Sequence, residues 1–477
     1  MRTDENSTSA QWRADTGRPA ERGAADLSEN RPPKQRTADT DRDRPAEPQA
    51  TSTTANEPPK RRAGGNAGRP GLGRSFHHLW AASGLSNLAD GVLLVGVPLL
   101  AVSLTRSPAQ VALVSAATTL PWLLLALHAG AIADRLDRRR IMVLAGWSRA
   151  AVLAATAAAA WLDLLSLPVL VAAVLLAGAA EVFADTSAQS ALPMTVTGDR
   201  LGAANGRLVA TQTLGNHFLG APLAGLLVGI ATTAVFGTAA LLYAAGALLL
   251  LGMRGRFRPE AAPAQALRAD IADGMRHLWG HRALRGLAAY SGVLNLAYGA
   301  YFAVFVLWVV GDGSRVGLTP GQYGLLAATL AAGAVAGSVL SGSLTRLTGE
   351  NGALVGVTLL NALLLVVPLL LPSPLVVFPA AAGIGAANAV TNVVSVSLRQ
   401  RLIPEGLLGR VNATCRLIGM GAMPLGAASA GLLATLAGMS AVFWSACALS
   451  LLAAAIILRG GEAGGPARGH RGAASRE

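Results

Sequence analysis

The feature that most constrains this chain is a series of twelve long apolar runs, separated by short breaks, between Leu79 and Leu458. Each run is long enough to cross about 30 Å of hydrocarbon as an α-helix. Only 14% of the residues are charged, against about 25% in soluble domains. The sequence therefore predicts an all-α membrane protein with twelve transmembrane helices. The expected spans are 79–104, 109–133, 141–162, 167–191, 204–229, 233–253, 285–310, 321–345, 352–371, 374–398, 408–434 and 440–458.

The rest of the chain lies before, between and after these runs. Residues 1–74 are polar and rich in Arg, Asp, Glu and Pro, which predicts a disordered tail. They contain no apolar run that could serve as a cleavable signal. Part of the central loop, 267–279, has one apolar stripe and predicts a surface helix. The expected parts are a cytoplasmic tail at 1–74, a six-helix half at 75–253, a linker loop at 254–284, a second six-helix half at 285–458 and a cytoplasmic tail at 459–477.

Arginines are concentrated in alternate loops. The even-numbered loops carry nearly all of them, and the odd-numbered loops carry only Arg106 and Arg315. By the positive-inside rule, the even loops and both termini are expected in the cytoplasm and the protein in the plasma membrane. This placement accounts for the net charge of +13. No soluble basic domain is present, so a nucleic-acid partner is not expected.

Two halves of the chain resemble each other. Gly84–Gly91 reads GLSNLADG and Gly292–Gly299 reads GVLNLAYG, 208 residues later. Gly220–Leu227 reads GAPLAGLL and Gly426–Leu433 reads GAASAGLL, 206 residues later. The nearly constant offset predicts two six-helix, pseudo-symmetric halves, an arrangement that places a substrate site between them.

Three carboxylates fall inside expected spans: Asp90, Glu181 and Asp185. Ionisable groups in a bilayer are costly and normally face the interior of the protein. Glu181 and Asp185 are four residues apart and share a helix face. One interpretation is structural pairing with Arg149, the only arginine deep in an expected span. The other is that the carboxylates bind and release a proton in each cycle.

Uncharged polar residues accompany these carboxylates. Asn87 shares a helical stripe with Asp90, and the corresponding segments of the second half carry Asn295, Asn388 and Asn392. These positions belong to the first, fourth, seventh and tenth spans. A shared water-filled cavity explains that distribution, with the asparagines as polar contacts to a substrate.

Two further sets of residues are open to both functional and structural interpretations. Tyr298, Tyr301 and Trp308 in the seventh span predict either an aromatic wall or contacts with helices and lipid. His217 in the fifth span is either a functional group or a packing histidine. The two cysteines, Cys415 and Cys447, are expected to be packing residues, because no disulfide framework or metal spacing is present.

The loop after the second span carries a recognisable motif. Gly130, Asp134, Arg135, Arg138 and Arg139 follow the signature loop of the major facilitator superfamily, which they resemble except that Asp137 replaces a glycine. The resemblance implies a cytoplasmic gate. Asp134 would face the N-terminus of the eleventh span, where the helix dipole favours a negative charge, and Arg138 and Arg139 would brace it.

A second motif lies in the fifth span. Gly215, Gly220, Pro222 and Gly225 resemble the antiporter signature of this superfamily, with Ala221 inserted between Gly220 and Pro222. Close helix packing is the alternative interpretation of these glycines. The resemblance covers 79–458 and is strongest to the efflux branch that includes enterobactin- and macrolide-exporter-like proteins.

The resemblance implies proton-coupled efflux of a small amphipathic compound, such as a drug, an antibiotic or a siderophore-like metabolite. No phosphate-binding Gly-x4-Gly-Lys-Ser/Thr motif occurs, so ATP is not an expected partner. We expect a monomer in contact with lipid, with no cofactor, no metal and no enzymatic activity. The alternatives are an uptake transporter and a non-transporting membrane sensor.

Overall fold

The structure is a computed structural model that describes residues 72–258, 275–403 and 408–461. Within these ranges the regular elements are helices, and one isolated β-bridge joins Val310 to Leu318. Among the described residues, eleven helical segments are long and apolar enough to cross a membrane. The expected tails and most of the expected surface helix at 267–279 lie outside the described residues.

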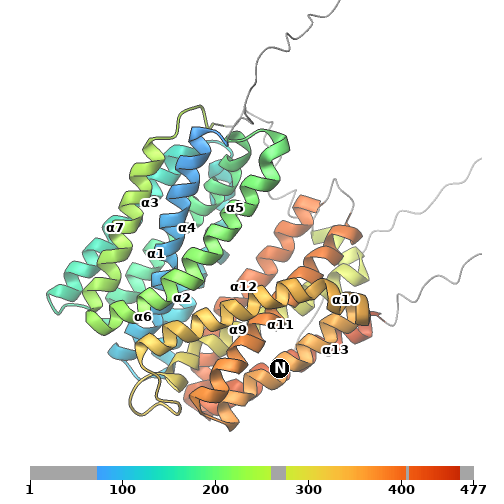
Figure 1. Cartoon of the computed structure of the whole chain (residues 1–477). Coiled ribbons are helices and arrows are strands. Elements are labelled where there is room, and N and C mark those ends of the chain that lie inside the picture. The colour runs from blue at the N-terminus through green and yellow to red at the C-terminus, as the bar shows by residue number, and fades with distance from the viewer. Residues whose placement is uncertain (1–71, 259–274, 404–407, 462–477) are drawn as a thin grey trace, which may run out of the picture. The chain divides into compact units, whose positions relative to one another are not determined.

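The helices before residue 252 form what we call the N-terminal group (Figure 1). A continuous helical segment from Gly198 to Ile230 contains a π-helix, η3, between two α-helices. The elements are α1 (Arg74–Leu104), α2 (Pro108–Ala133), α3 (Arg138–Trp161), α4 (Leu167–Ala191), the short turns η1 (Leu192–Met194) and η2 (Gly198–Arg200), α5 (Leu201–Thr213), η3 (Leu214–Gly220), α6 (Ala221–Ile230) and α7 (Thr232–Leu251).

The helices after residue 281 form the C-terminal group. Its second member, α10, has 51 residues and is interrupted at Gly349, where φ is 72° and ψ is 171°. As one straight helix, 51 residues would measure about 77 Å, more than twice the thickness of a bilayer core, whereas α10 consists of two helices joined at Gly349. The elements are α9 (Arg282–Val309), α10 (Pro320–Leu370), α11 (Pro374–Leu402), α12 (Leu408–Ala437) and α13 (Met439–Gly461).

Large apolar side chains cover the outside of the molecule as well as its interior. Leu144, Leu241 and Leu375 are among the most exposed of them, at 68%, 73% and 86%. Such a surface is unstable in water but suits lipid tails. Proline begins several helices, as at Pro108 and Pro374, where its missing N–H costs nothing.

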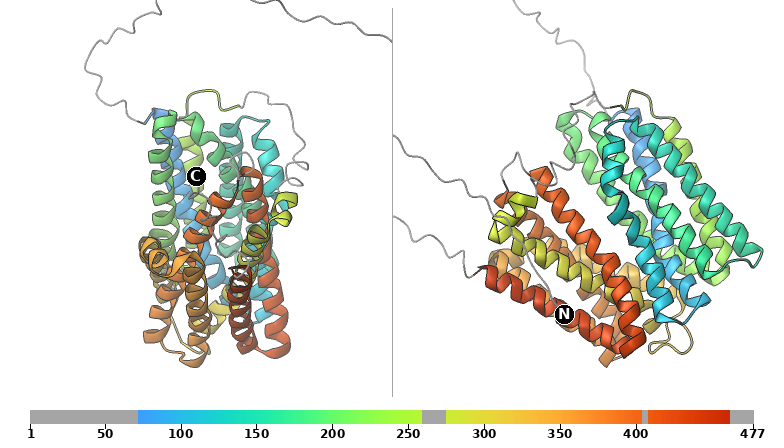
Figure 2. Two further views of the ribbon diagram at one scale, coloured as in Figure 1. Left: turned by 90° about the vertical axis from the view of Figure 1, so that its right-hand side faces the viewer. Right: turned by 180° about the vertical axis from the view of Figure 1, so that it is seen from behind.

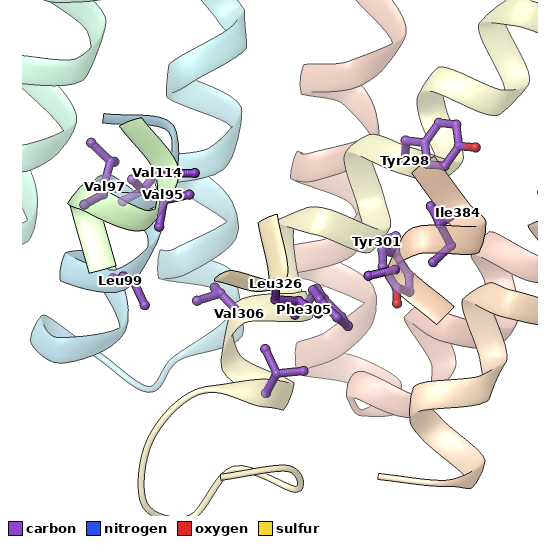
Figure 3. Packing of buried hydrophobic residues seen from close by; sticks show 14 of the residues in the cluster. Val95, Val97, Leu99, Val114, Tyr298, Tyr301, Phe305, Val306, Leu326 and Ile384 are labelled. Carbon is purple, nitrogen blue, oxygen red and sulfur yellow. The ribbon is translucent and has the colours of Figure 1, made fainter. Parts of the chain in front are cut away.

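One apolar core runs through both groups. It joins Val95 and Val114 of the N-terminal group to Val306 and Leu326 of the C-terminal group (Figure 3). These residues lie near the loop 310–319, whose Val310 carbonyl accepts a hydrogen bond of 3.1 Å from Arg106. We call this end of the molecule the 310–319 face, and the opposite helix ends the 134–137 face.

Direct contact between the groups occurs where α2 meets α12 and where α6 meets α10. Figure 2 shows the helices of both groups from two further sides. A Cβ atom built on Gly225 would lie 2.6 Å from the Pro320 carbonyl oxygen. One built on Gly431 would lie 2.8 Å from the Ala112 Cβ. Both contacts are close to the 310–319 face, so the two groups are packed most tightly there.

The repeated sequence segments make matching contacts. A Cβ on Gly91 of α1 would lie 2.3 Å from the carbonyl oxygen of Asn216 in η3. A Cβ on Gly299 of α9 would lie 2.2 Å from the carbonyl oxygen of Met423 in α12. Only glycine allows backbones so close. These pairs of residues are related by offsets of 208 and 207, close to those of the repeats.

Candidate functional site

A buried arginine holds two of the three carboxylates. Arg149 of α3 is 1% exposed. Its Nη2 donates to Asp90 Oδ1 of α1 at 2.5 Å and to Glu181 Oε2 of α4 at 3.1 Å. Three helices are therefore tied together by one guanidinium nitrogen.

A tyrosine on a fourth helix completes the cluster. The Tyr243 hydroxyl of α7 donates to Asp90 Oδ1 at 2.6 Å. Its ring centroid lies 3.9 Å from the guanidinium carbon of Arg149, which adds a cation–π contact. Asp90 thus accepts from both Arg149 and Tyr243. We call Asp90, Arg149, Glu181 and Tyr243 the charged cluster.

The charged cluster retains unused hydrogen-bonding capacity. Arg149 Nε and Nη1 are buried and have no hydrogen-bond partner among the described residues. Buried donors without partners are energetically costly. These two N–H groups can therefore donate to an oxygen atom of water or of a substrate without the loss of an existing contact.

Asp185 lies one turn beyond Glu181 on α4 and differs from it in its contacts. No ion pair within 4 Å joins Asp185 to another described residue, although it is near enough to Asp90 and Arg149 to feel their charges. Asp185 lines a cavity of about 60 Å³ together with Asn87, Arg149 and Tyr243. That volume admits a few water molecules but not an organic compound.

The expected asparagines do not gather around the charged cluster. Asn87 and Asn295 each donate to a backbone carbonyl four residues earlier, at 2.7 and 2.8 Å. Asn388 and Asn392 are exposed on α11. Of the four, Asn87 lines the cavity beside Asp185.

Of the two interpretations open for Tyr298, Tyr301 and Trp308, an aromatic wall or contacts with helices and lipid, the structure favours contact between helices, because all three are buried within the C-terminal group. Tyr298 donates to Asn361 Oδ1 at 3.0 Å and Trp308 Nε1 donates to the Pro368 carbonyl at 2.9 Å. Tyr301 packs against aromatic neighbours (Figure 3). Contact between helices, the alternative interpretation, describes these residues.

The motif at 130–139 ties helix ends together on the 134–137 face. Asp137, which replaces the glycine of the family pattern, caps α3 by accepting from the Arg140 N–H at 3.0 Å. Arg138 donates to the Ser190 carbonyl at 2.8 Å and pairs with the exposed Asp134 at 3.5 Å. Arg139 donates to the Leu250 carbonyl at 3.0 Å.

The two remaining residues of this motif make fewer contacts, since Arg135 is exposed and a Cβ on Gly130 would have no neighbour within 4 Å. The expected contact of Asp134 with the eleventh span involves side chains at 404–410, which lie outside the described part of the chain.

The antiporter-like motif packs on both neighbouring helices. Gly215 and Gly220 belong to the π-helix η3, and a Cβ on Gly220 would lie 2.7 Å from the Gly91 Cα. Pro222 and Gly225 face the start of α10. His217 is half-buried in the same π-helix. η3 therefore lies directly behind the segment of α1 that carries Asp90.

Sequence reasoning missed three residues near the site: Tyr243, Trp122 and Arg416. Tyr243 stands in a run of Ala and Leu that gives no sign of a polar contact. The Trp122 side chain lies close to Glu181. Arg416 of α12 lies over the Trp122 ring, with 5.2 Å between its guanidinium carbon and the ring centroid. For Trp122 and Arg416, the one feature of the sequence that could have indicated a functional role is that Trp and Arg are rare inside membrane spans.

A helical membrane protein that encloses an ionised cluster among its spanning helices has the character of a transporter, and known proteins agree. The chain belongs to the major facilitator superfamily: the family model described as transmembrane secretion effector matches residues 70–461. Family and fold together identify a multi-pass membrane transporter rather than an enzyme.

The curated relatives include the multidrug efflux pump Tap of Mycobacterium tuberculosis, which is 29% identical over 382 residues, 77% of this chain and 88% of that protein. Tap of Mycolicibacterium fortuitum is 27% identical over 367 residues, 74% of this chain and 88% of its own.

Solved structures share the fold. A bacterial homologue of the iron transporter ferroportin, in an inward-facing state, has a TM-score of 0.66 and 16% identity and covers 81% of this chain and 98% of its own. A bacterial homologue of the lysosomal transporter Spinster has a TM-score of 0.64 and 15% identity and covers 83% of this chain and 98% of its own.

Proposed function

We propose that this protein is a proton-coupled exporter of a small amphipathic compound. The charged cluster carries the proposal. It places Asp90 and Glu181 on one guanidinium nitrogen of Arg149 inside the membrane-spanning helices. A protein that needed these helices only as a scaffold would gain little from burying three charges there.

The cluster has the chemistry of a proton carrier. Asp90 and Glu181 compete for Arg149. When one of the two carboxylates is protonated, the other still pairs with the guanidinium, and this ion pair has no net charge. Asp185 forms no ion pair with another described residue and lines a cavity that water can enter. It provides a route by which a proton reaches or leaves the pair.

The architecture that supports this mechanism is a set of twelve spans in two six-helix halves. The long helix α10, interrupted at Gly349, contributes two of the twelve spans. The matched contacts of Gly91 and Gly299 support the duplication. The distribution of arginines among the loops supports cytoplasmic termini, which makes the 134–137 face cytoplasmic.

The conformation follows from that orientation. The close contacts of Gly225 with Pro320 and of Gly431 with Ala112, and the hydrogen bond of Arg106, join the two helix groups near the 310–319 face, which would be the extracellular one. The substrate site is then closed to the outside and reached from the cytoplasm, as an exporter requires before it loads. The resemblance to the multidrug efflux pump Tap supports export rather than uptake.

Transport by reconstituted protein tests the coupling. In proteoliposomes with an imposed pH gradient, we expect Asp90→Asn and Glu181→Gln to lose gradient-driven export while retaining substrate exchange without a gradient. Glu350→Gln is the matched control, because Glu350 pairs with Arg401 outside the cluster.

Unchanged gradient-driven export in Asp90→Asn, Glu181→Gln and Asp185→Asn would rule out the coupling role. Accumulation in the opposite direction would favour an uptake transporter. The absence of flux with a broad panel of compounds would favour a sensor.

A further inference from the structure

The contact between Trp122 and Arg416 joins the charged cluster of the N-terminal group to the C-terminal group. Trp122 lies on α2 and is half-buried. Its side chain lies close to Glu181 of the cluster. Trp122 therefore stands between the cluster and Arg416 of α12, whose guanidinium carbon lies over the Trp122 ring.

Arg416 is weakly held at this position. Its side chain is exposed, and no ion pair within 4 Å joins it to another described residue. Its guanidinium carbon lies 5.2 Å from the Trp122 ring centroid, and its charge acts on Asp185 from beyond ion-pair distance. An exposed cation–π contact is among the weaker interactions in a protein. Another cation could therefore replace the guanidinium.

The surrounding charges decide what could replace it. Asp90, Glu181 and Asp185 bring three carboxyl groups, and Arg149 pairs with the first two. The positive charge of Arg416, which belongs to the C-terminal group, also acts on Asp185. An anion entering here would be repelled. A cation with a flat apolar face would gain both the Asp185 charge and the Trp122 ring.

We propose that Arg416 is an internal cation that occupies the cation position of the substrate site, over Trp122 and beside Asp185, and that the transported compound is an amphipathic cation that displaces it. The proposal rests on the proposed export function and adds its substrate class. Displacement also removes a contact between α2 and α12. Loading of the site is thereby linked to the separation or closure of the two helix groups.

Binding of tetraphenylphosphonium to the purified full-length protein tests the proposal. Arg416→Gln removes the competing charge, so its affinity for tetraphenylphosphonium should rise about twofold to fivefold, which corresponds to the loss of one exposed cation–π competitor. Arg416→Lys keeps a competing cation and should remain close to the wild type. Isothermal titration calorimetry measures both.

The chain offers a matched control. Arg315 lies over Trp308 at 5.8 Å in the C-terminal group, and Arg315→Gln should leave the affinity unchanged. Neutral triphenylphosphine oxide should bind the wild type and Arg416→Gln alike. In a Trp122→Leu background, Arg416→Gln should have a smaller effect, because the two residues share one site.

Equal or weaker cation binding by a folded Arg416→Gln protein would overturn the proposal, as would an equal gain for the neutral compound. Thermal unfolding of each variant shows whether it is folded. The measurement needs no proton gradient, so it can fail while proton-coupled export stands. Normal cation binding without gradient-driven export would instead overturn the proposed function.

Discussion

The N-terminal and C-terminal helix groups use the same packing contacts for different chemistry. In each group a glycine in a repeated segment touches the backbone of a partner helix: Gly91 at Asn216, and Gly299 at Met423. Asn87 and Asn295 also make the same hydrogen bond to the preceding helical turn.

The polar interiors of the two groups differ in charge. The N-terminal group contains the charged cluster. At the position that corresponds to Asp90, the C-terminal group has Tyr298, whose hydroxyl donates to Asn361. Asn361 Nδ2 in turn donates to Ser450 Oγ at 3.5 Å. This network is neutral throughout. The comparison teaches that the packing and the ionisable chemistry are separable, so each can be changed by substitution without the other.

The largest expected effect is the loss of the buried arginine. Arg149→Met leaves two buried carboxylates without their cation and should lower the free energy of unfolding by about 3–5 kcal/mol. Asn361→Leu in the neutral network should cost about 1 kcal/mol. Unfolding in mixed micelles by titration with sodium dodecyl sulfate measures both.

Restoring charge balance is the control for that prediction. The triple variant Arg149→Met, Asp90→Asn, Glu181→Gln removes the unpaired charges and should recover most of the lost stability. If Arg149→Met and Asn361→Leu lowered the free energy of unfolding equally, the interiors of the two groups would not differ in the energetic role of charge.

An intermediate effect is expected where the packing is shared. Gly91→Ala and Gly299→Ala each place a methyl group within 2.3 Å of a carbonyl oxygen. Each should lower the free energy of unfolding by about 3 kcal/mol, near the upper end of the usual cost of overpacking. Gly237→Ala in α7, where a Cβ has no neighbour within 4 Å, is the control and should be neutral or stabilising. Clearly unequal losses for the two contact variants would contradict a shared scaffold.

The smallest expected effect comes from removing one hydroxyl in each group. Tyr243→Phe removes a hydrogen bond to the Asp90 carboxylate and should cost about 1.5 kcal/mol. Tyr298→Phe removes a hydrogen bond to an amide and should cost about 0.6 kcal/mol, the average for such bonds in membrane proteins. The same unfolding assay measures both, and a reversed order would show that charge does not distinguish the two interiors.

The sequence predicted the helical membrane fold well because it depends on run length and composition, which are local properties. It also identified Asp90, Glu181, Asp185 and Arg149, since charge inside an apolar run is conspicuous. The pairing of Arg149 with both Asp90 and Glu181 was one of two open interpretations. Periodicity gives the face on which a residue lies but not which helix that face meets.

The same limit explains what the sequence could not supply. Tyr298 and Trp308 could be placed on a helix but not assigned to its buried side, so the sequence left an aromatic wall and contact between helices both open. The contact of Trp122 with Arg416 joins residues 294 positions apart on α2 and α12. It depends on how the two helix groups meet, and no local pattern encodes that.

The π-helix at Leu214–Gly220 has a consequence for the fifth spanning segment as a whole. A π-helix arises where one residue more than an α-helix needs is fitted into the turn. If η3 relaxed to α-helical hydrogen bonding, the residues before it would rotate by about 100° and advance by about 1.5 Å relative to those after it. The far end of the segment, Ala221–Ile230, could remain against α10 while Leu201–Thr213 presented a different set of side chains. The residues before η3 thus have two possible helical registers relative to the residues after it, one with the π-helix and one without it.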